Sequence, residues 1–173
     1  QHPDRLDLSS PFGNAYRNEW STDTKVNDGK TLQAAYYAMI ELIDHQVGRI
    51  LNELKNSNQS EDTIVIFMSD HGEMLGDHGL IQKGCRFYEG LVRVPLIFSW
   101  PNTFPEGIVS NGLVELIDLA PTLMEISGNS VPDWMQGKSL LPIATGVSDP
   151  THHHDSVLCE YFDALDKPNS SRA

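Results

Sequence analysis

The order of two hydrophobic patterns constrains the fold of this chain more than any other feature of its sequence. Apolar residues between Leu32 and Leu54 recur at steps of three and four, which is the spacing of one face of an α-helix. The next apolar segment, residues 63–69, is a continuous run rich in β-branched residues, which is typical of a buried parallel strand. A long helix followed directly by such a strand indicates a layered α/β protein.

Segments further along the chain continue this alternation. Additional short strands are predicted at residues 94–100, 112–116 and 157–162. Between them, Asp118 is predicted to be the N-cap of a helix that ends at Gly128. The pattern therefore favours an α/β fold in which helices and strands alternate.

The charge balance of the chain limits its partners. The 173 residues include 12 basic and 24 acidic side chains, which gives a formal net charge of −12. Lysine and arginine are scattered, so the basic footprint of a DNA- or RNA-binding protein is absent. No stretch approaches the roughly 20 consecutive apolar residues of a membrane span. An anionic substrate would need a local cation, either a bound metal or a well-placed lysine or arginine.

The cysteines and the ends of the chain are less informative. Cys85 and Cys159 allow at most one disulfide and show no zinc-binding or C-x-x-C spacing, so we interpret them as two thiols. Residues 1–30 are polar and rich in turn residues, which predicts an irregular arm. Because the chain begins at Gln1 and ends in a polar run, we expect it to be a segment of a longer protein.

Residues 69–84 carry most of the candidate chemistry. Asp70 and His71 come directly after the predicted strand, at the end where open α/β sheets bind ligands. Neighbouring strand residues point to opposite faces, so these two side chains can converge only if the chain leaves extended geometry, which Gly72 permits. On the residues alone, two interpretations stay open. One is half of a metal site, and the other is a capping aspartate beside a hydrogen-bonded histidine in a turn.

The same region resembles a known family. The run TIVIFMSDHGEMLGDHGL at 63–80, then Lys83, then YEGLVRVPLIF at 88–98, is similar to the second half of a type I sulfatase of the alkaline-phosphatase-like superfamily. Further similar blocks occupy residues 34–51, 113–128 and 136–142. The resemblance implies a three-layer α/β fold, with a mostly parallel sheet flanked by helices, present here as a partial domain.

The resemblance also implies a domain organisation. Residues 1–173 would be the downstream portion of one sulfatase catalytic domain, divided into an arm at 1–30, a family-like core at 31–146, and a loop, strand and polar end at 147–173. Sulfatases of this type use a cysteine in a C-x-P-x-R or C-x-A-x-R motif, which is oxidised to formylglycine. Neither Cys85 nor Cys159 fits this motif, so we expect the nucleophile outside this chain.

Particular roles follow from the resemblance. It implies that Asp70 and His71 are metal ligands and that Lys83 is catalytic and binds the charged oxygens of the substrate. The metal is expected to be Ca²⁺, with Mg²⁺ or Mn²⁺ as alternatives, although an imidazole is an unexpected ligand for a hard ion. His78 is considered as a substrate-binding residue at the border of the site, with a structural role as the alternative.

Other polar residues receive simpler interpretations. Arg93 is predicted to form an ion pair or to anchor a loop. The acidic side chains in the same segment, Glu73, Asp77 and Glu89, are predicted to be solvated. The histidines at 152–154, followed by Asp155, resemble a chelating tract, but their position before a predicted strand favours a surface loop.

The function implied by the resemblance is hydrolysis of a sulfuric ester. In the full-length protein, a metal-dependent reaction would cleave a sulfate ester to an alcohol and sulfate, and this segment alone is expected to be inactive. Two alternatives remain: a phosphonate or phosphodiester hydrolase of the same superfamily, and a non-catalytic fragment or binding protein that keeps the fold. The expected partners are a small-molecule or saccharide sulfate ester and the missing N-terminal half, in a periplasmic or extracellular protein of open oligomeric state.

Overall fold

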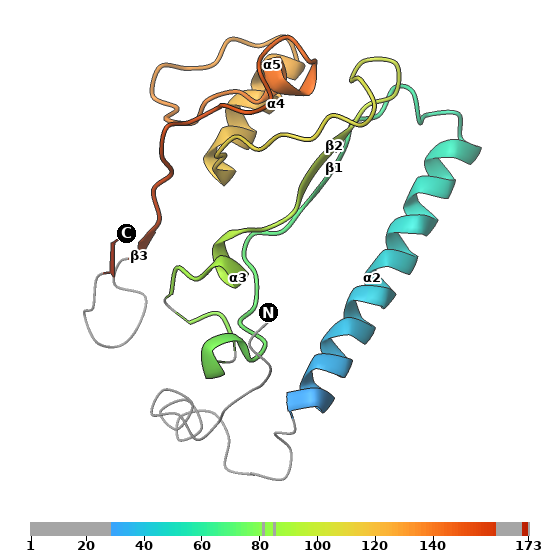
Figure 1. Cartoon of the computed structure of the whole chain (residues 1–173). Coiled ribbons are helices and arrows are strands. Elements are labelled where there is room, and N and C mark those ends of the chain that lie inside the picture. The colour runs from blue at the N-terminus through green and yellow to red at the C-terminus, as the bar shows by residue number, and fades with distance from the viewer. Residues whose placement is uncertain (1–28, 81, 85, 162–170, 173) are drawn as a thin grey trace. The chain divides into compact units, whose positions relative to one another are not determined.

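The computed structural model describes residues 29–80, 82–84, 86–161 and 171–172 (Figure 1). The chain divides into two compact units, which are described separately. The first unit comprises Gln1–Ser57 and Met68–Pro95, and the second comprises Asn58–Phe67 and Leu96–Ala173. The predicted arm up to residue 28 and the residue Cys85 lie outside the described residues. Cys159 is a free, partly buried thiol.

The first unit begins with the long helix α2, Gly29–Asn56, which confirms the predicted helix (Figure 1). The helix ends where the Ser57 hydroxyl donates a hydrogen bond back to the carbonyl of Glu53 and Asn58 takes a left-handed φ of 55°. No residue of α2 is fully buried, and most of its predicted apolar face is exposed within the described part of the chain. None of the described helices is long and apolar enough to span a membrane.

The described residues between positions 68 and 95 form a loop with two short helices, η1 at Asp77–Gly79 and α3 at Glu89–Val92. A small core holds the loop together and consists of the buried side chains of Met74, Leu80 and Leu91. Gly72 lies against this core, and its N–H donates to the carbonyl of Leu91 at 2.8 Å. A Cβ at Gly72 would lie 1.8 Å from the carbonyl oxygen of Gly90, so only glycine fits there.

The strands β1, Val65–Met68, and β2, Leu96–Ser99, pair in a two-stranded sheet at the positions that the sequence predicts. The prediction that the first of them is buried is wrong for this chain. Phe67 and Met68 in β1 and Ile97 in β2 are exposed. A strand buried on both faces needs cover on both sides, and the described residues do not provide it.

The helix α4, Leu119–Ile126, confirms the predicted helix after Asp118. Its end also follows the prediction, because Gly128 takes a left-handed φ of 74°. The N–H of Gly128 donates to the carbonyl of Glu125, and the N–H of Asn129 reaches back to the carbonyl of Met124, each at 2.9 Å. This pair of hydrogen bonds is a Schellman motif, in which glycine is the favoured left-handed residue.

The strand predicted at residues 112–116 is wrong. Only Leu113 pairs, in an isolated antiparallel bridge with His154. The chain then turns into the 3₁₀ helix η2, Leu116–Asp118, where Glu115 and Asp118 form a reciprocal capping box. The cap satisfies backbone donors locally, so this segment folds as a turn rather than extending into a strand.

The last predicted strand, residues 157–162, begins later than expected, and its final residue lies outside the described residues. The strand β3 covers only Glu160–Tyr161 and pairs in antiparallel register with β4, Ser171–Arg172. Before β3, the N–H of Leu158 donates to a side-chain oxygen of Glu115 at 2.8 Å. This N–H is therefore not used in a hydrogen bond between strands.

The second unit has its own small buried interior around α4 and α5, Leu141–Ala144. Its buried side chains include both apolar and polar groups. They are Asp118, Pro121, Thr122, Leu140, Ile143 and His153. Thr122 is hydrogen-bonded on both sides, since its hydroxyl donates to the carbonyl of Asp118 and accepts the N–H of Leu140 at 2.8 Å. Polar groups are therefore an integral part of this interior.

Candidate functional site

The chain turns immediately after β1, and this turn brings Asp70 and His71 to the same side. The Ser69 hydroxyl donates to the carbonyl of His71 at 2.7 Å, and Asp70 Oδ1 accepts the N–H of His71 at 2.9 Å. As a result, His71 Nε2 lies 3.8 Å from Asp70 Oδ2. The side chains are 42% and 81% exposed, so the pair faces open space.

The tautomer of His71 follows from its hydrogen bond to the backbone. Its Nδ1 lies 2.8 Å from the carbonyl oxygen of Gly72. A carbonyl oxygen only accepts hydrogen bonds, so Nδ1 carries the proton and Nε2 of the neutral ring presents a lone pair. Histidine ligands of metals are commonly held by such a second hydrogen bond.

Lys83 approaches the same nitrogen. Its Nζ lies 3.0 Å from His71 Nε2, so the ammonium donates to the lone pair. Gln82 and Gly84, on either side of Lys83, have left-handed φ values of 62° and 52°, which turn the chain sharply at this point. Asp70, His71 and Lys83 together are called the exposed cluster below.

The donor set of the exposed cluster suits a cation. Ligand bonds of about 2.0–2.5 Å from a carboxylate oxygen and an imidazole nitrogen to one ion would place those two atoms about 3–4 Å apart. The 3.8 Å between Asp70 Oδ2 and His71 Nε2 falls in this range. A divalent cation bound here would take the Nε2 lone pair that Lys83 Nζ contacts at 3.0 Å, so the ammonium would turn away from this nitrogen to the edge of the site.

The remaining residues singled out in this loop have separate contacts. The His78 ring stacks on Tyr88, with ring centroids 4.4 Å apart and an interplanar angle of 23°. Its role in substrate binding stays a prediction. Arg93 forms an exposed ion pair with Glu89 at 3.7 Å, which confirms the ion-pair prediction. Of the acidic residues, Glu73 accepts the N–H of Leu75 at 3.2 Å.

A second cluster of polar side chains lies in the other unit, and sequence reasoning missed it. The surface-loop prediction for residues 152–154 is wrong for His153, which is 4% exposed. His153 and His154 both approach Asp118, whose side chain is fully buried. Only His152 behaves as predicted, since it is exposed and lies 3.6 Å from Asp155. Asp118, His153 and His154 are called the buried cluster below.

Asp118 holds the buried cluster together. It occupies the N-cap position of α4 but makes no capping hydrogen bond to that helix. Instead, its oxygens accept the backbone N–H groups of Glu115 and Lys138, each at 2.8 Å. Burial by itself would raise the pKa of the Asp118 carboxyl, but these hydrogen bonds and His154 outweigh it, so the pKa lies below 3.8.

Comparison with known proteins identifies the family. The sequence profile of the sulfatase family, described as "Sulfatase", matches residues 4–129. This chain belongs to the sulfatase family. An arylsulfatase of Clostridium perfringens is 42% identical over 114 residues, which cover 64% of this chain and 24% of the relative.

Solved structures agree with the sulfatase assignment and with the alkaline-phosphatase-like fold. A protein solved in complex with its substrate D-glucosamine-2-N,6-O-disulfate has a TM-score of 0.73 and 27% identity over 92% of this chain and 33% of its own. A phosphonate monoester hydrolase from Silicibacter pomeroyi has a TM-score of 0.77 and 30% identity, and the match covers 96% of this chain and 35% of the hydrolase. This sulfatase chain therefore spans about a quarter to a third of the length of these relatives.

Proposed function

We propose that this chain supplies the cation-binding and charge-stabilising part of a sulfatase active site. The observation that carries the proposal is the convergence of Asp70 Oδ2 and Lys83 Nζ on one atom, His71 Nε2. The chain would act as the downstream portion of a single catalytic domain, with the nucleophile, expected to be a formylglycine, in the upstream portion. A periplasmic or extracellular location belongs to the same proposal and rests on the family.

Membership of the sulfatase family favours a divalent cation, and Asp70 and His71 would be two of its ligands. Calcium takes six to eight oxygen ligands, so these two side chains would leave most of the shell to the upstream portion. We expect Ca²⁺, with Mg²⁺ or Mn²⁺ as alternatives, since the imidazole is an unusual ligand for calcium. The bound cation would polarise the sulfate oxygens and offset their charge.

Lys83 would bind the substrate and stabilise the charge that develops in the transition state. In the free site, its ammonium donates to His71 Nε2 at 3.0 Å. With the ester bound, the same ammonium would donate to a charged ester oxygen, the kind of directed electrostatic contact that lowers reaction barriers most. His71 would keep its proton at Nδ1, where the carbonyl of Gly72 holds it. His78 is proposed only as a border residue of this site, stacked on Tyr88.

A sulfated saccharide is the substrate class we favour. The substrate of one structural relative is a glucosamine disulfate. The similar phosphonate monoester hydrolase supports a second candidate, hydrolysis of phosphonate or phosphodiester substrates. The net charge of −12 does not steer either anion inward, which leaves recognition to the cation and Lys83.

Substrate competition in the full-length protein tests the proposal. The metal-loaded protein would be offered a sulfated glucosamine and an aryl phosphonate monoester, and kcat/KM would be measured for each. A higher value for the sulfate ester is expected. A higher value for the phosphonate would favour the second candidate. No turnover of either, together with an upstream sequence lacking a C-x-P-x-R or C-x-A-x-R motif, would favour a binding protein instead.

A further inference from the structure

The buried cluster brings Asp118 together with the adjacent histidines His153 and His154 from a distant part of the sequence, and all three side chains are of types that can ligate a metal. His154 Nε2 lies 3.1 and 3.0 Å from the two oxygens of Asp118, and His153 Nε2 lies 3.4 Å from Oδ2. The three ligand atoms all fall within 4.8 Å of one another. The carboxylate is fully buried, His153 is nearly so, and the side chain of His154 is 19% exposed.

These separations match the edges of a tetrahedral metal site. Zinc binds imidazole nitrogen at about 2.0–2.1 Å and carboxylate oxygen at about 2.0–2.2 Å, so neighbouring ligand atoms lie about 3.3–3.5 Å apart. The observed 3.0–3.4 Å between Asp118 and the two imidazoles needs only small adjustments. Two nitrogens and one oxygen are the donors that zinc-type ions prefer, whereas calcium prefers oxygen alone.

Surrounding contacts fix the Asp118 carboxylate and the backbone of the two histidines. Glu115 and Lys138 donate their N–H groups to Asp118, which fixes the direction of the carboxylate. Lys138 Nζ donates to the carbonyl of His153 at 2.8 Å, and His154 pairs with Leu113. Hydrogen bonds to the ligating group itself, such as those that Asp118 accepts, orient ligands in natural metal sites. Burial lowers the pKa of His153, which favours the neutral ring that a metal requires.

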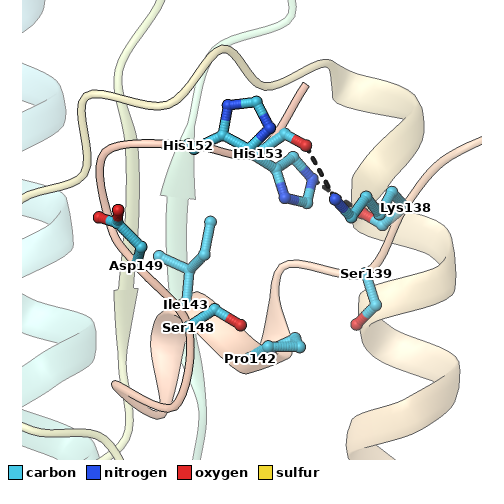
Figure 2. Close-up of a pocket in the computed structure, with 8 residues that line it drawn as sticks. All are labelled: Lys138, Ser139, Pro142, Ile143, Ser148, Asp149, His152 and His153. Carbon is cyan, nitrogen blue, oxygen red and sulfur yellow. Dashed lines mark hydrogen bonds between the residues drawn. The ribbon is translucent and has the colours of Figure 1, made fainter. Parts of the chain in front are cut away.

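One member of the buried cluster, His153, borders a pocket. His153 lines a pocket of about 460 Å³ together with residues of the α5 region (Figure 2). Figure 2 shows His153 beside the Lys138 side chain, at the edge of this pocket, with His152 next to it. An ion held by the buried cluster could therefore be reached through the His153 side, and a water or another small ligand could occupy its remaining position.

We propose that Asp118, His153 and His154 form a site for a zinc-type divalent metal, separate from the Asp70–His71 pair. The proposal does not depend on the sulfatase activity, because its three ligands all lie in the second unit and its readout is metal binding. The competing interpretation is a metal-free network in which both imidazoles donate to Asp118, with His153 Nε2 also 3.2 Å from the carbonyl of Lys138.

Glutamine substitutions separate the two interpretations. A glutamine at position 153 or 154 can still donate an N–H to Asp118, so a purely hydrogen-bonded network would survive, but an amide is a poor zinc ligand. The test uses the full-length protein with Asp70→Ala, which removes the other expected cation site. Co²⁺ is titrated into the metal-free protein and visible absorption is recorded, followed by displacement with Zn²⁺ and elemental analysis.

We expect one Co²⁺ per chain with the absorption of a tetrahedral site, and at least about tenfold weaker binding in H153Q and H154Q. The matched control is H152Q, which changes the exposed neighbouring histidine and should bind like the parent. Thermal unfolding of each variant without metal shows whether the fold is intact. Absence of tetrahedral absorption in the parent, or equal affinity in H154Q and H152Q, would overturn the proposal in favour of the metal-free network.

Discussion

The exposed and buried clusters use similar side chains in opposite surroundings. In the exposed cluster, Asp70 and Lys83 face open space, and the contacts of the His71 ring are to the carbonyl of Gly72 and to these two exposed side chains. In the buried cluster, Asp118 is fully enclosed and receives two backbone N–H groups as well as two imidazoles. The first cluster is open to substrate and further ligands, while the second is nearly self-contained.

Because of this difference, we expect the exposed cluster to affect function and the buried cluster to affect the stability of the fold. An exposed charged side chain contributes little to the free energy of folding, so its main role is in binding. A buried carboxylate must be compensated, and removing it leaves its donors without partners. Substitutions in the exposed cluster should therefore change function at constant stability, and substitutions in the buried cluster should change stability first.

Replacing Asp118 should have the largest effect. D118A leaves the N–H groups of Glu115 and Lys138 buried without their acceptor, so we expect a loss of about 3–5 kcal/mol in the free energy of unfolding. Chemical denaturation of the full-length protein would measure it. D155A, at the exposed position that directly follows His154, is the control and should change stability by less than about 0.5 kcal/mol. Equal decreases in the free energy of unfolding of D118A and D155A would contradict the proposed difference between buried and exposed carboxylates.

Lys83 should show the opposite behaviour. K83A in the full-length protein is expected to lower kcat/KM roughly 10²–10³-fold, the scale of one directed electrostatic contact, with an unchanged melting temperature. K55A, at the exposed end of α2, serves as the control. Near-normal turnover of a sulfate ester by K83A would remove this residue from the mechanism.

Asp70 should affect metal content as well as activity. D70A removes the carboxylate that lies 3.8 Å from His71 Nε2, so we expect the metal occupancy of that site and the turnover to fall together by at least about tenfold. Elemental analysis after removal of loosely bound ions measures the occupancy, with D62A as an exposed control. Full metal content in D70A would argue against ligation.

The exposed Arg93–Glu89 pair should contribute little. Both side chains are solvated at 85% and 79% exposure, so R93A should change the free energy of unfolding by less than about 0.5 kcal/mol. Raising the salt concentration should reduce the effect further. A decrease of more than about 1 kcal/mol in the free energy of unfolding would show that the exposure of an ion pair does not by itself predict its contribution to stability.

Asp149 offers the smallest and most local test. Hydrogen bonds from the N–H and hydroxyl of Thr151 hold the pKa of Asp149 below its ordinary value of 3.8. A carboxyl whose pKa is lowered by folding stabilises the folded state at pH values above its ordinary pKa. This stabilisation is lost as the pH falls through the pKa of the folded state. T151A removes the hydroxyl donor, so an NMR titration should show the pKa rising toward 3.8. An unchanged pKa would mean that the backbone N–H alone sets it.

The sequence predicted what depends on local pattern. The span of α2, the positions of β1 and β2 and the end of α4 at Gly128 all follow from periodicity, β-branched runs and glycine. Burial was not predictable in the same way. Most of the apolar face of α2 and the β1 residues Phe67 and Met68 are exposed among the described residues. A local pattern gives the spacing of apolar side chains but does not reveal whether another segment covers them.

The two clusters differ in the same respect. Asp70, His71 and Lys83 belong to one loop, and only 12 residues separate His71 from Lys83. Family resemblance pointed to all three. Asp118 and His154 are separated by 36 residues, and the intervening segment contains no motif that links them. The capping box at Glu115, which turns Asp118 away from α4, was the missing step, since an N-cap aspartate is expected to bond to its own helix.

Anomalous diffraction from a crystal of the full-length protein loaded with Mn²⁺ or Ca²⁺ tests the exposed cluster most directly. The expected result is an ion about 2.0–2.6 Å from a carboxylate oxygen of Asp70 and from His71 Nε2, with Lys83 Nζ turned toward a sulfate oxygen of a bound substrate. A fully occupied ion elsewhere, with Asp70, His71 and Lys83 left in solvent, would contradict the proposed active site.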